Sequence, residues 1–152
     1  DYALSGGADG IYFDGTNDII EIPVHPDFNF LTGDFTIEMW INVSSIANYD
    51  GLITFDGTAS ADLALGFGSG DSKLHLYSNA GGGTSTSVAN SGDTIATSRW
   101  YHIAVTRLSG KTNFFLDGTS KSSLLGLGRV CWFAPSDVPS FRVQIFPRNS
   151  LC

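Results

Sequence analysis

The sequence is short of positive charge, of cysteine and of long hydrophobic runs, and each shortage excludes a class of protein. Lysine and arginine together number 8 against 15 acidic residues, which leaves a net charge of −7. The clustered cations that bind a nucleic-acid backbone are therefore missing. No apolar run is long enough to cross a bilayer, so we expect no membrane insertion. Cys131 and Cys152 are too few for a disulfide-rich scaffold; they either pair with each other or remain free thiols.

Residues that favour helices are also scarce, and this shortage directs the fold prediction. Glutamate occurs at only two positions and lysine at three, whereas 18 glycines and many Asp, Ser and Thr separate short runs of Phe, Ile and Val. No segment repeats its apolar residues at helical spacing. This composition is typical of an all-β protein with many turns. The length of 152 residues, with no linker, predicts a single domain.

Residues 35–43, FTIEMWINV, give the clearest secondary-structure signal in the chain. Apolar residues at the odd-numbered positions alternate with Thr, Glu, Trp and Asn at the even-numbered ones. Successive side chains of a strand point to opposite faces of a sheet, so this pattern predicts a half-buried strand. One strand cannot bury its apolar face alone, and the rest of the chain should contribute strands that cover it.

Further short apolar runs between turn residues predict the remaining strands. They cover residues 19–22, 51–55, 63–67, 73–78, 100–107, 112–116, 124–128 and 141–146. The runs 100–107 and 112–116 flank a short turn and predict a β-hairpin. Residues 11–13 and 19–22 flank a cluster of Asp, Gly and Asn, which predicts a hairpin or a tight corner between strands.

Two further expectations concern the surface and the core. Residues 79–90, NAGGGTSTSVAN, are rich in Gly, Ser and Thr, and we expect them to form a mobile loop. Trp40 and Trp100 lie within predicted strands, and we expect both indoles to pack in the core of the second layer.

Four motifs share their order and spacing with a known family. They are YFDGTNDIIEIP at 12–23, GDFTIEMWIN at 33–42, RWYHIAVTR at 99–107 and NFFLDGT at 113–119. Together they resemble a laminin G-like domain of the concanavalin A-like lectin/glucanase superfamily. The resemblance implies a jelly-roll β-sandwich of two antiparallel sheets, formed by one domain over residues 1–152.

The resemblance is uneven along the chain. It is strongest over residues 10–120, and residues 124–152 form a divergent closing segment. In the family an acidic pair usually precedes the valine of the closing strand, and here Phe141 and Arg142 take its place.

The superfamily includes glycosidases, so the acidic residues decide whether the chain resembles an enzyme. Glucanases of the superfamily carry their catalytic acids on one strand, and retaining glycosidases need two carboxyls about 5–5.5 Å apart. Glu21 and Glu38 are the only glutamates and fall on separate predicted strands. We therefore predict that the protein is not an enzyme, with glycoside hydrolysis as a remote alternative.

Many relatives in this superfamily hold a calcium ion near loops at the sheet edge. Asp14, Asn17 and Asp18 lie in one turn and offer the oxygen ligands that calcium prefers. Other predicted turns that could converge with them contain Asp34, Asp56 and Asp117. Because Asp and Asn also favour turns for conformational reasons, structural calcium stays an open expectation.

Sugar binding would use an exposed aromatic ring for stacking and nearby polar groups for the hydroxyls. The candidates are Tyr49 with Asp50, Tyr77 and Trp132, although each aromatic would also serve as ordinary packing. We therefore predict a non-catalytic recognition module, extracellular or on a particle surface, that binds a glycan or a protein partner.

The alternative function is a structural subunit of an assembly, such as a virion decoration, fibre or surface-layer protein. Such a subunit would pack against copies of itself or against other subunits. The charged residues make up only 15% of the chain, and residues 130–146 are rich in proline and aromatics. A buried contact surface tends to shed charge in this way.

Overall fold

The residues that the structure describes form ten strands. The computed structural model describes residues 10–15, 18–23, 25, 28, 33–56, 61–78, 86–125 and 140–144. The strands are β1 (Ile19–Ile22), β2 (Phe35–Asn42), β3 (Gly51–Asp56), β4 (Ala61–Phe67), β5 (Leu74–Ser78), β6 (Thr86–Asn90), β7 (Trp100–Leu108), β8 (Lys111–Leu116), β9 (Thr119–Leu125) and β10 (Ser140–Gln144). The described part of the chain holds no helix with the length and hydrophobicity needed to cross a membrane.

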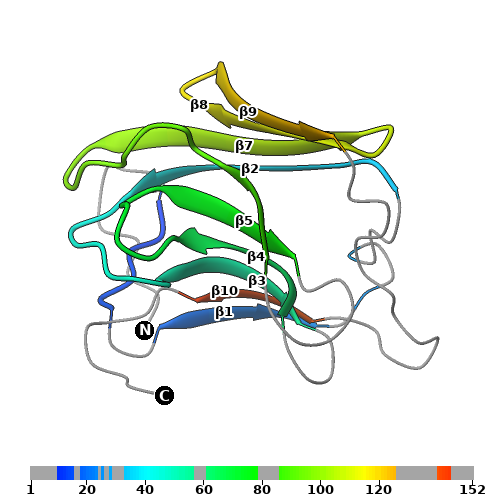
Figure 1. Cartoon of the computed structure of the whole chain (residues 1–152). Helices are drawn as coiled ribbons and strands as arrows, with labels where there is room; N and C mark the ends of the chain where they lie inside the picture. Colours follow the sequence, from blue (N-terminus) through cyan, green and yellow to red (C-terminus); the bar gives the residue numbers. More distant parts are fainter. Residues whose placement is uncertain are drawn as a thin grey trace.

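The strands form two antiparallel sheets that stack face to face (Figure 1). One sheet has six strands in the order β1-β10-β3-β4-β5-β6, and the other has four in the order β2-β7-β8-β9. The predicted hairpin of residues 100–107 and 112–116 is present, because β7 pairs with β8. This arrangement confirms the predicted all-β fold and its two-sheet antiparallel sandwich.

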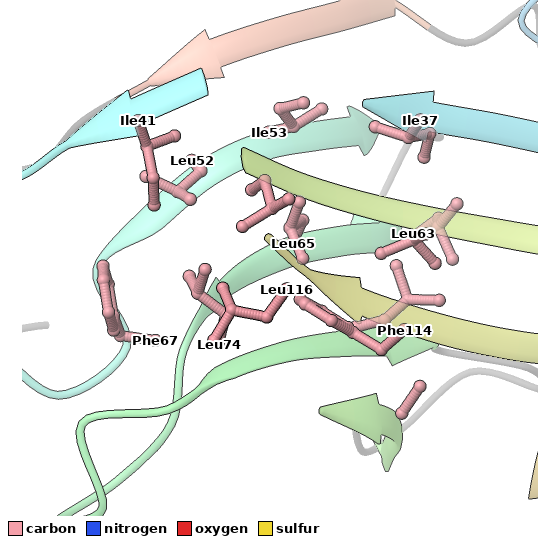
Figure 2. Packing of buried hydrophobic residues seen from close by; sticks show 14 of the residues in the cluster. Ile37, Ile41, Leu52, Ile53, Leu63, Leu65, Phe67, Leu74, Phe114 and Leu116 are labelled. Atoms are coloured by element: carbon pink, nitrogen blue, oxygen red, sulfur yellow. The ribbon is translucent and has the colours of Figure 1, made fainter. Parts of the chain in front are cut away.

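The core lies between the sheets, and strand alternation supplies its residues (Figure 2). Strand β2 buries Phe35, Ile37 and Ile41 and exposes the residues between them. From the facing sheet, β4 contributes its odd-numbered apolar residues and β5 its even-numbered leucines, all 1% exposed or less. Removing a side chain of this size from water contributes about 1.5–3 kcal/mol each, so this layer provides most of the stabilisation of the fold.

The structure corrects two expectations about strands. Residues 86–90 form β6, although the segment 79–90 was expected to be a loop. This strand is polar in sequence, but it pairs with β5 and buries Val88 and Ala89. Residues 11–13 form no strand, so they make no hairpin with β1, which pairs with β10 instead.

The expectation that Trp40 and Trp100 pack in the core is wrong. The two residues are 64% and 54% exposed. Both lie on even-numbered positions of β2 and β7, whose odd-numbered positions face the core. The alternation of the strand outweighs the size of the side chain, because rotating either indole inward would turn the neighbouring apolar residues outward.

Candidate functional site

A cluster of polar and aromatic side chains lies on the outer face of the six-stranded sheet. Strand β5 alternates buried leucines with His75 and Tyr77, which face outward. Asp71 precedes this strand, and Ser87 lies on the neighbouring strand β6, opposite Tyr77. Together with Tyr49 from the β2–β3 connection, these residues form what we call the tyrosine–histidine surface.

His75 is the centre of a hydrogen-bonded chain on this surface. Its Nε2 lies 2.9 Å from Asp71 Oδ2 and its Nδ1 lies 2.7 Å from Ser87 Oγ. Because a carboxylate can only accept, Nε2–H donates to Asp71. The imidazole also stacks on Tyr77, with ring centroids 5.6 Å apart and an interplanar angle of 21°. The ring is therefore fixed by contacts at both nitrogens and on one face.

The Asp71 carboxylate is held in its charged form. Desolvation is the largest single influence and by itself raises the pKa of Asp71. The hydrogen bonds from the Lys73 N–H and the His75 ring, together with the electrostatic interactions of both side chains, act in the opposite direction. They outweigh the desolvation, so the pKa of Asp71 lies below its ordinary value of 3.8. The surface therefore presents a stable anionic acceptor at neutral pH.

Gly66 in β4 and Gly68, which follows the end of this strand, make room for this arrangement. A Cβ at Gly68 would lie 2.5 Å from His75 Nε2 and 2.7 Å from Asp71 Oδ1. A Cβ at Gly66 would lie 2.6 Å from the backbone oxygen of Asp50. Only glycine lets the imidazole and the β2–β3 connection lie this close to the strand.

The β2–β3 and β4–β5 connections meet at the same end of the molecule, on the left of Figure 1. The Gly70 N–H donates to Asn48 Oδ1 at 2.8 Å and joins the two connections. The Asp50 carboxylate accepts the Ala47 N–H at 2.6 Å and closes its own turn. Burial raises the pKa of Asp50 from its ordinary value of 3.8, and this backbone hydrogen bond only partly offsets it.

Tyr49 is the exposed member of the tyrosine–histidine surface. Its φ of 65° places it in the left-handed region, which side chains other than glycine adopt rarely. The turn leaves its side chain 68% exposed. The pKa of Tyr77 is raised from 10.0, first by burial and then by the Asp71 charge and by Tyr49. Tyr49 and Tyr77 are therefore close enough to interact electrostatically.

The structure thus brings three predicted residues to one end of the sheet. Tyr49 and Tyr77 share the surface, whereas the Asp50 carboxylate braces the adjacent turn. Trp132 lies outside the described residues. The sequence reasoning missed Asp71, His75 and Ser87. The alternation of β5 could have indicated His75, because it lies two residues from Tyr77 and so on the same face.

The predicted calcium turn is only partly described. The Asp14 N–H donates to Asp18 Oδ2 at 2.8 Å, so Asp18 closes this turn, while Asn17 lies outside the described residues. Within the described ranges, no group of three or more His, Cys, Asp or Glu residues is arranged to hold a metal ion. Structural calcium stays a prediction, and so does the pairing of Cys131 with Cys152, since both cysteines lie outside the description.

The other aspartates named for calcium do not all converge. Asp34 Oδ1 accepts the Ser109 N–H at 2.7 Å, and Asp117 Oδ1 accepts the His102 N–H at 2.9 Å. Residue 102 lies near the start of β7 and residue 109 directly follows its end, so the two N–H groups that these carboxylates accept from are about 23 Å apart at 3.3 Å per residue. Asp34 and Asp117 therefore serve as caps for two separate turns.

The two glutamates are also far apart. Glu38 is exposed on the outer face of β2, and Glu21 is exposed on β1 in the other sheet. In the backbone register of β1 and β10, Glu21 aligns with residue 142. Because stacked sheets are about 10 Å apart, outward residues on opposite sheets cannot form the carboxyl pair of a glycosidase.

A comparison with models of protein families shows to which superfamily the chain is related. Residues 14–146 match a laminin G-type family model, described as concanavalin A-like lectin/glucanases superfamily. The chain belongs to this superfamily. The predicted resemblance is thereby confirmed. Among curated proteins, none matches the sequence.

Solved structures similar to this superfamily member show the same fold at low sequence identity. Galectin LEC-6 from Caenorhabditis elegans has a TM-score of 0.54 and 15% identity, over 87% of this chain and 86% of the galectin. Domain 4 of AbnA, an extracellular GH43 arabinanase from Geobacillus stearothermophilus, was solved with arabinotriose. It has a TM-score of 0.53 and 15% identity, over 78% of this chain and 54% of that one.

A third similar structure is the native heptameric SAP-like pentraxin from Limulus polyphemus. Its TM-score is 0.52 with 12% identity, over 74% of this chain and 52% of the pentraxin chain. The chain thus spans about half the length of the arabinanase domain and of the pentraxin. These likenesses establish a lectin-like fold.

Proposed function

We propose that the chain is a non-catalytic recognition module, extracellular or on a particle surface, that binds a glycan at the tyrosine–histidine surface. The lectin-like fold supports binding of carbohydrate as the general role. The similar arabinanase domain was solved in complex with arabinotriose, which gives one example of a sugar on this fold.

The observation that carries the proposal is the fixed stack of His75 and Tyr77 beside the exposed Tyr49. A sugar offers an apolar ring face bordered by hydroxyls, and this surface offers aromatic rings bordered by the Asp71 carboxylate and the Ser87 hydroxyl. Because hydrogen bonds already hold these groups in place, binding needs little further ordering of side chains.

The test is an array of neutral and acidic glycans, followed by titration of the best ligand. Tyr49→Ala and Tyr77→Ala should each weaken binding about fivefold to tenfold, which corresponds to the ~1–1.5 kcal/mol typical of one aromatic contact. Tyr12→Ala is the matched control, because Tyr12 is 75% exposed and is not part of this surface. The proposal is wrong if no glycan binds, or if the two surface variants bind as well as the control.

A second candidate function has one specific observation in its favour. Ser87, His75 and Asp71 are connected in the order of a serine-hydrolase triad, with spacings of 2.7 and 2.9 Å. Here Ser87 contacts Nδ1 and Asp71 contacts Nε2, the reverse of the usual assignment. If Ser87 is a nucleophile, a fluorophosphonate probe should label it, and Ser87→Ala should abolish that labelling. The absence of a labelled Ser87 peptide would remove this candidate.

A further inference from the structure

We propose that the chain carries a second glycan-binding surface, on the outer face of the four-stranded sheet. It consists of Trp40, Asn42, Trp100 and His102, and we call it the tryptophan surface. It takes a neutral polysaccharide. This inference goes beyond the function proposed above and does not depend on the tyrosine–histidine surface, with which it shares no residue.

Strand pairing places the two indoles together. Trp40 aligns with His102, and Asn42 aligns with Trp100, across the antiparallel pair β2–β7. Trp40 and Trp100 are therefore diagonal neighbours on one face, with Cβ atoms about 7–8 Å apart. The Trp40 and His102 rings are in contact, with centroids 5.1 Å apart and tilted by 52°. At this spacing both indoles can contact sugars of one polysaccharide chain.

The exposure of this pair is unusual for the surface of a small domain. Single exposed apolar side chains are common. Two tryptophans that are 64% and 54% exposed on adjacent strands form a contiguous aromatic patch instead. Such patches mark surfaces that bind a partner, because leaving them in water costs free energy that a ligand recovers.

The side chains around the two indoles indicate which class of ligand this surface binds. The neighbouring outward residues are mainly hydrogen-bonding side chains, namely Thr36, Glu38, Asn42, Thr106 and Asn113. Lys111 and the half-buried Phe115 also face outward from β8. On the outward positions of β2 and β7 the aliphatic side chains are Ala104 and Leu108. The core of a protein interface is depleted in charged residues, whereas this face exposes Glu38 two residues from Trp40, and Lys111 on β8.

Charge excludes a polyanionic glycan on this face. Glu38 is exposed two residues from Trp40, and the chain carries a net charge of −7. An acidic polysaccharide would be repelled by both. Aromatic faces bordered mainly by hydrogen-bonding side chains match a neutral polysaccharide, whose rings present C–H groups to the indoles and hydroxyls to the rim.

The backbone beneath the tryptophan surface is firmly held. Asp117 accepts the His102 N–H at 2.9 Å, and its own N–H donates to the His102 carbonyl at 2.8 Å. Arg99 Nη2 donates to the second oxygen of Asp117 at 3.0 Å, and the guanidinium lies over the Tyr101 ring at 4.5 Å. These contacts fix the start of β7, so the Trp100 ring is presented from a rigid backbone.

The two proposed surfaces lie on opposite outer faces of the sandwich, at the end where β2 finishes and β7 begins (Figure 1). A single chain can therefore hold two polysaccharide strands at once. Binding at both surfaces of a multivalent polymer would raise the apparent affinity through effective concentration, without any new contact.

The test follows tryptophan fluorescence during titration with a soluble neutral β-glucan, with polygalacturonate as the acidic comparison. The glucan should shift the emission to shorter wavelength and protect it from acrylamide, whereas polygalacturonate should not. Trp40→Ala and Trp100→Ala should each weaken glucan binding about tenfold, and Trp40→Tyr should retain part of it. Leu108→Ala is the matched control, because Leu108 is 65% exposed on the same face of β7.

The proposal is overturned if glucan leaves the emission unchanged, or if the tryptophan variants bind like Leu108→Ala. It is also overturned if acrylamide fails to quench the emission of the free protein, or if sedimentation shows that copies of the chain associate through this face. Tyr77→Ala should keep the full tryptophan response. Failure at the tyrosine–histidine surface and failure at the tryptophan surface are therefore measured separately.

Discussion

Gly68→Ala should disrupt the tyrosine–histidine surface while leaving the core intact. The added Cβ would lie 2.5 Å from His75 Nε2, 2.6 Å from His75 Cδ2 and 2.7 Å from Asp71 Oδ1. Carbon atoms do not approach other heavy atoms this closely, so the imidazole must rotate away. It would then lose its hydrogen bond to Asp71, and the stack on Tyr77 would shift. Overpacking of this kind costs about 1–3 kcal/mol.

The measurement has two parts. Urea denaturation should show a loss of stability of about 1–3 kcal/mol with an unchanged m-value, because the unfolded chain exposes the same surface. Glycan titration should show weaker binding at the tyrosine–histidine surface and an unchanged tryptophan response. Gly10→Ala is the control, because its Cβ would make only an ordinary contact of 4.0 Å with Trp100. Equal stability and equal glycan affinity for Gly68→Ala and Gly10→Ala would refute the reasoning.

Further predictions concern the core and two titrating groups. Phe114 is 0% exposed, and Phe114→Ala should lower the free energy of unfolding in urea by about 3–5 kcal/mol. Ser78 Oγ is buried without a hydrogen-bond partner in the described part of the chain, so Ser78→Ala should raise the same free energy by about 1 kcal/mol. The pKa of Asp71 lies below its unfolded value of 3.8. The ionised Asp71 carboxylate therefore stabilises the folded chain above pH 3.8, and this contribution disappears as the pH falls through the folded-state pKa. The free energy of unfolding of Asp71→Asn should lack this dependence on pH. Folding raises the pKa of Tyr77 above 10.0. The stability of the native chain should therefore decline relative to Tyr77→Phe as the pH rises through the folded-state value.

The strands with strict alternation were predictable from the sequence. In β2 the odd-numbered residues are apolar, and the structure buries Phe35, Ile37 and Ile41 as expected. The same alternation, applied consistently, would have placed Trp40 outside. The error came from giving hydrophobicity more weight than position in the strand. Strand β6 could not be predicted in this way, because its stability comes from pairing with β5 and not from its own residues.

The candidate site was predictable only in part. Tyr49 and Tyr77 carry a recognisable chemistry, but they are far apart in sequence. The Asn48–Gly70 hydrogen bond joins the β2–β3 connection to the β4–β5 connection and so brings Tyr49 towards the start of β5, the strand that carries Tyr77. The contact between His75 and Ser87 depends on the register of β5 against β6, which includes a bulge. Such a register shift follows from the packing of both strands and leaves no signal in a single sequence.

The polar ties between the sheets have a mechanical consequence. Asn90 of β6 exchanges two hydrogen bonds with the Ser122 hydroxyl of β9, and Lys121 Nζ lies 2.6 Å from Asp93 Oδ2. These contacts join the two sheets along one edge of the sandwich, where β6 and β9 lie. We therefore expect the sheets to separate first along the opposite edge, which is formed by β1 in one sheet and β2 in the other. Amide hydrogens of β1 and β2 should exchange with solvent before those of β6 and β9.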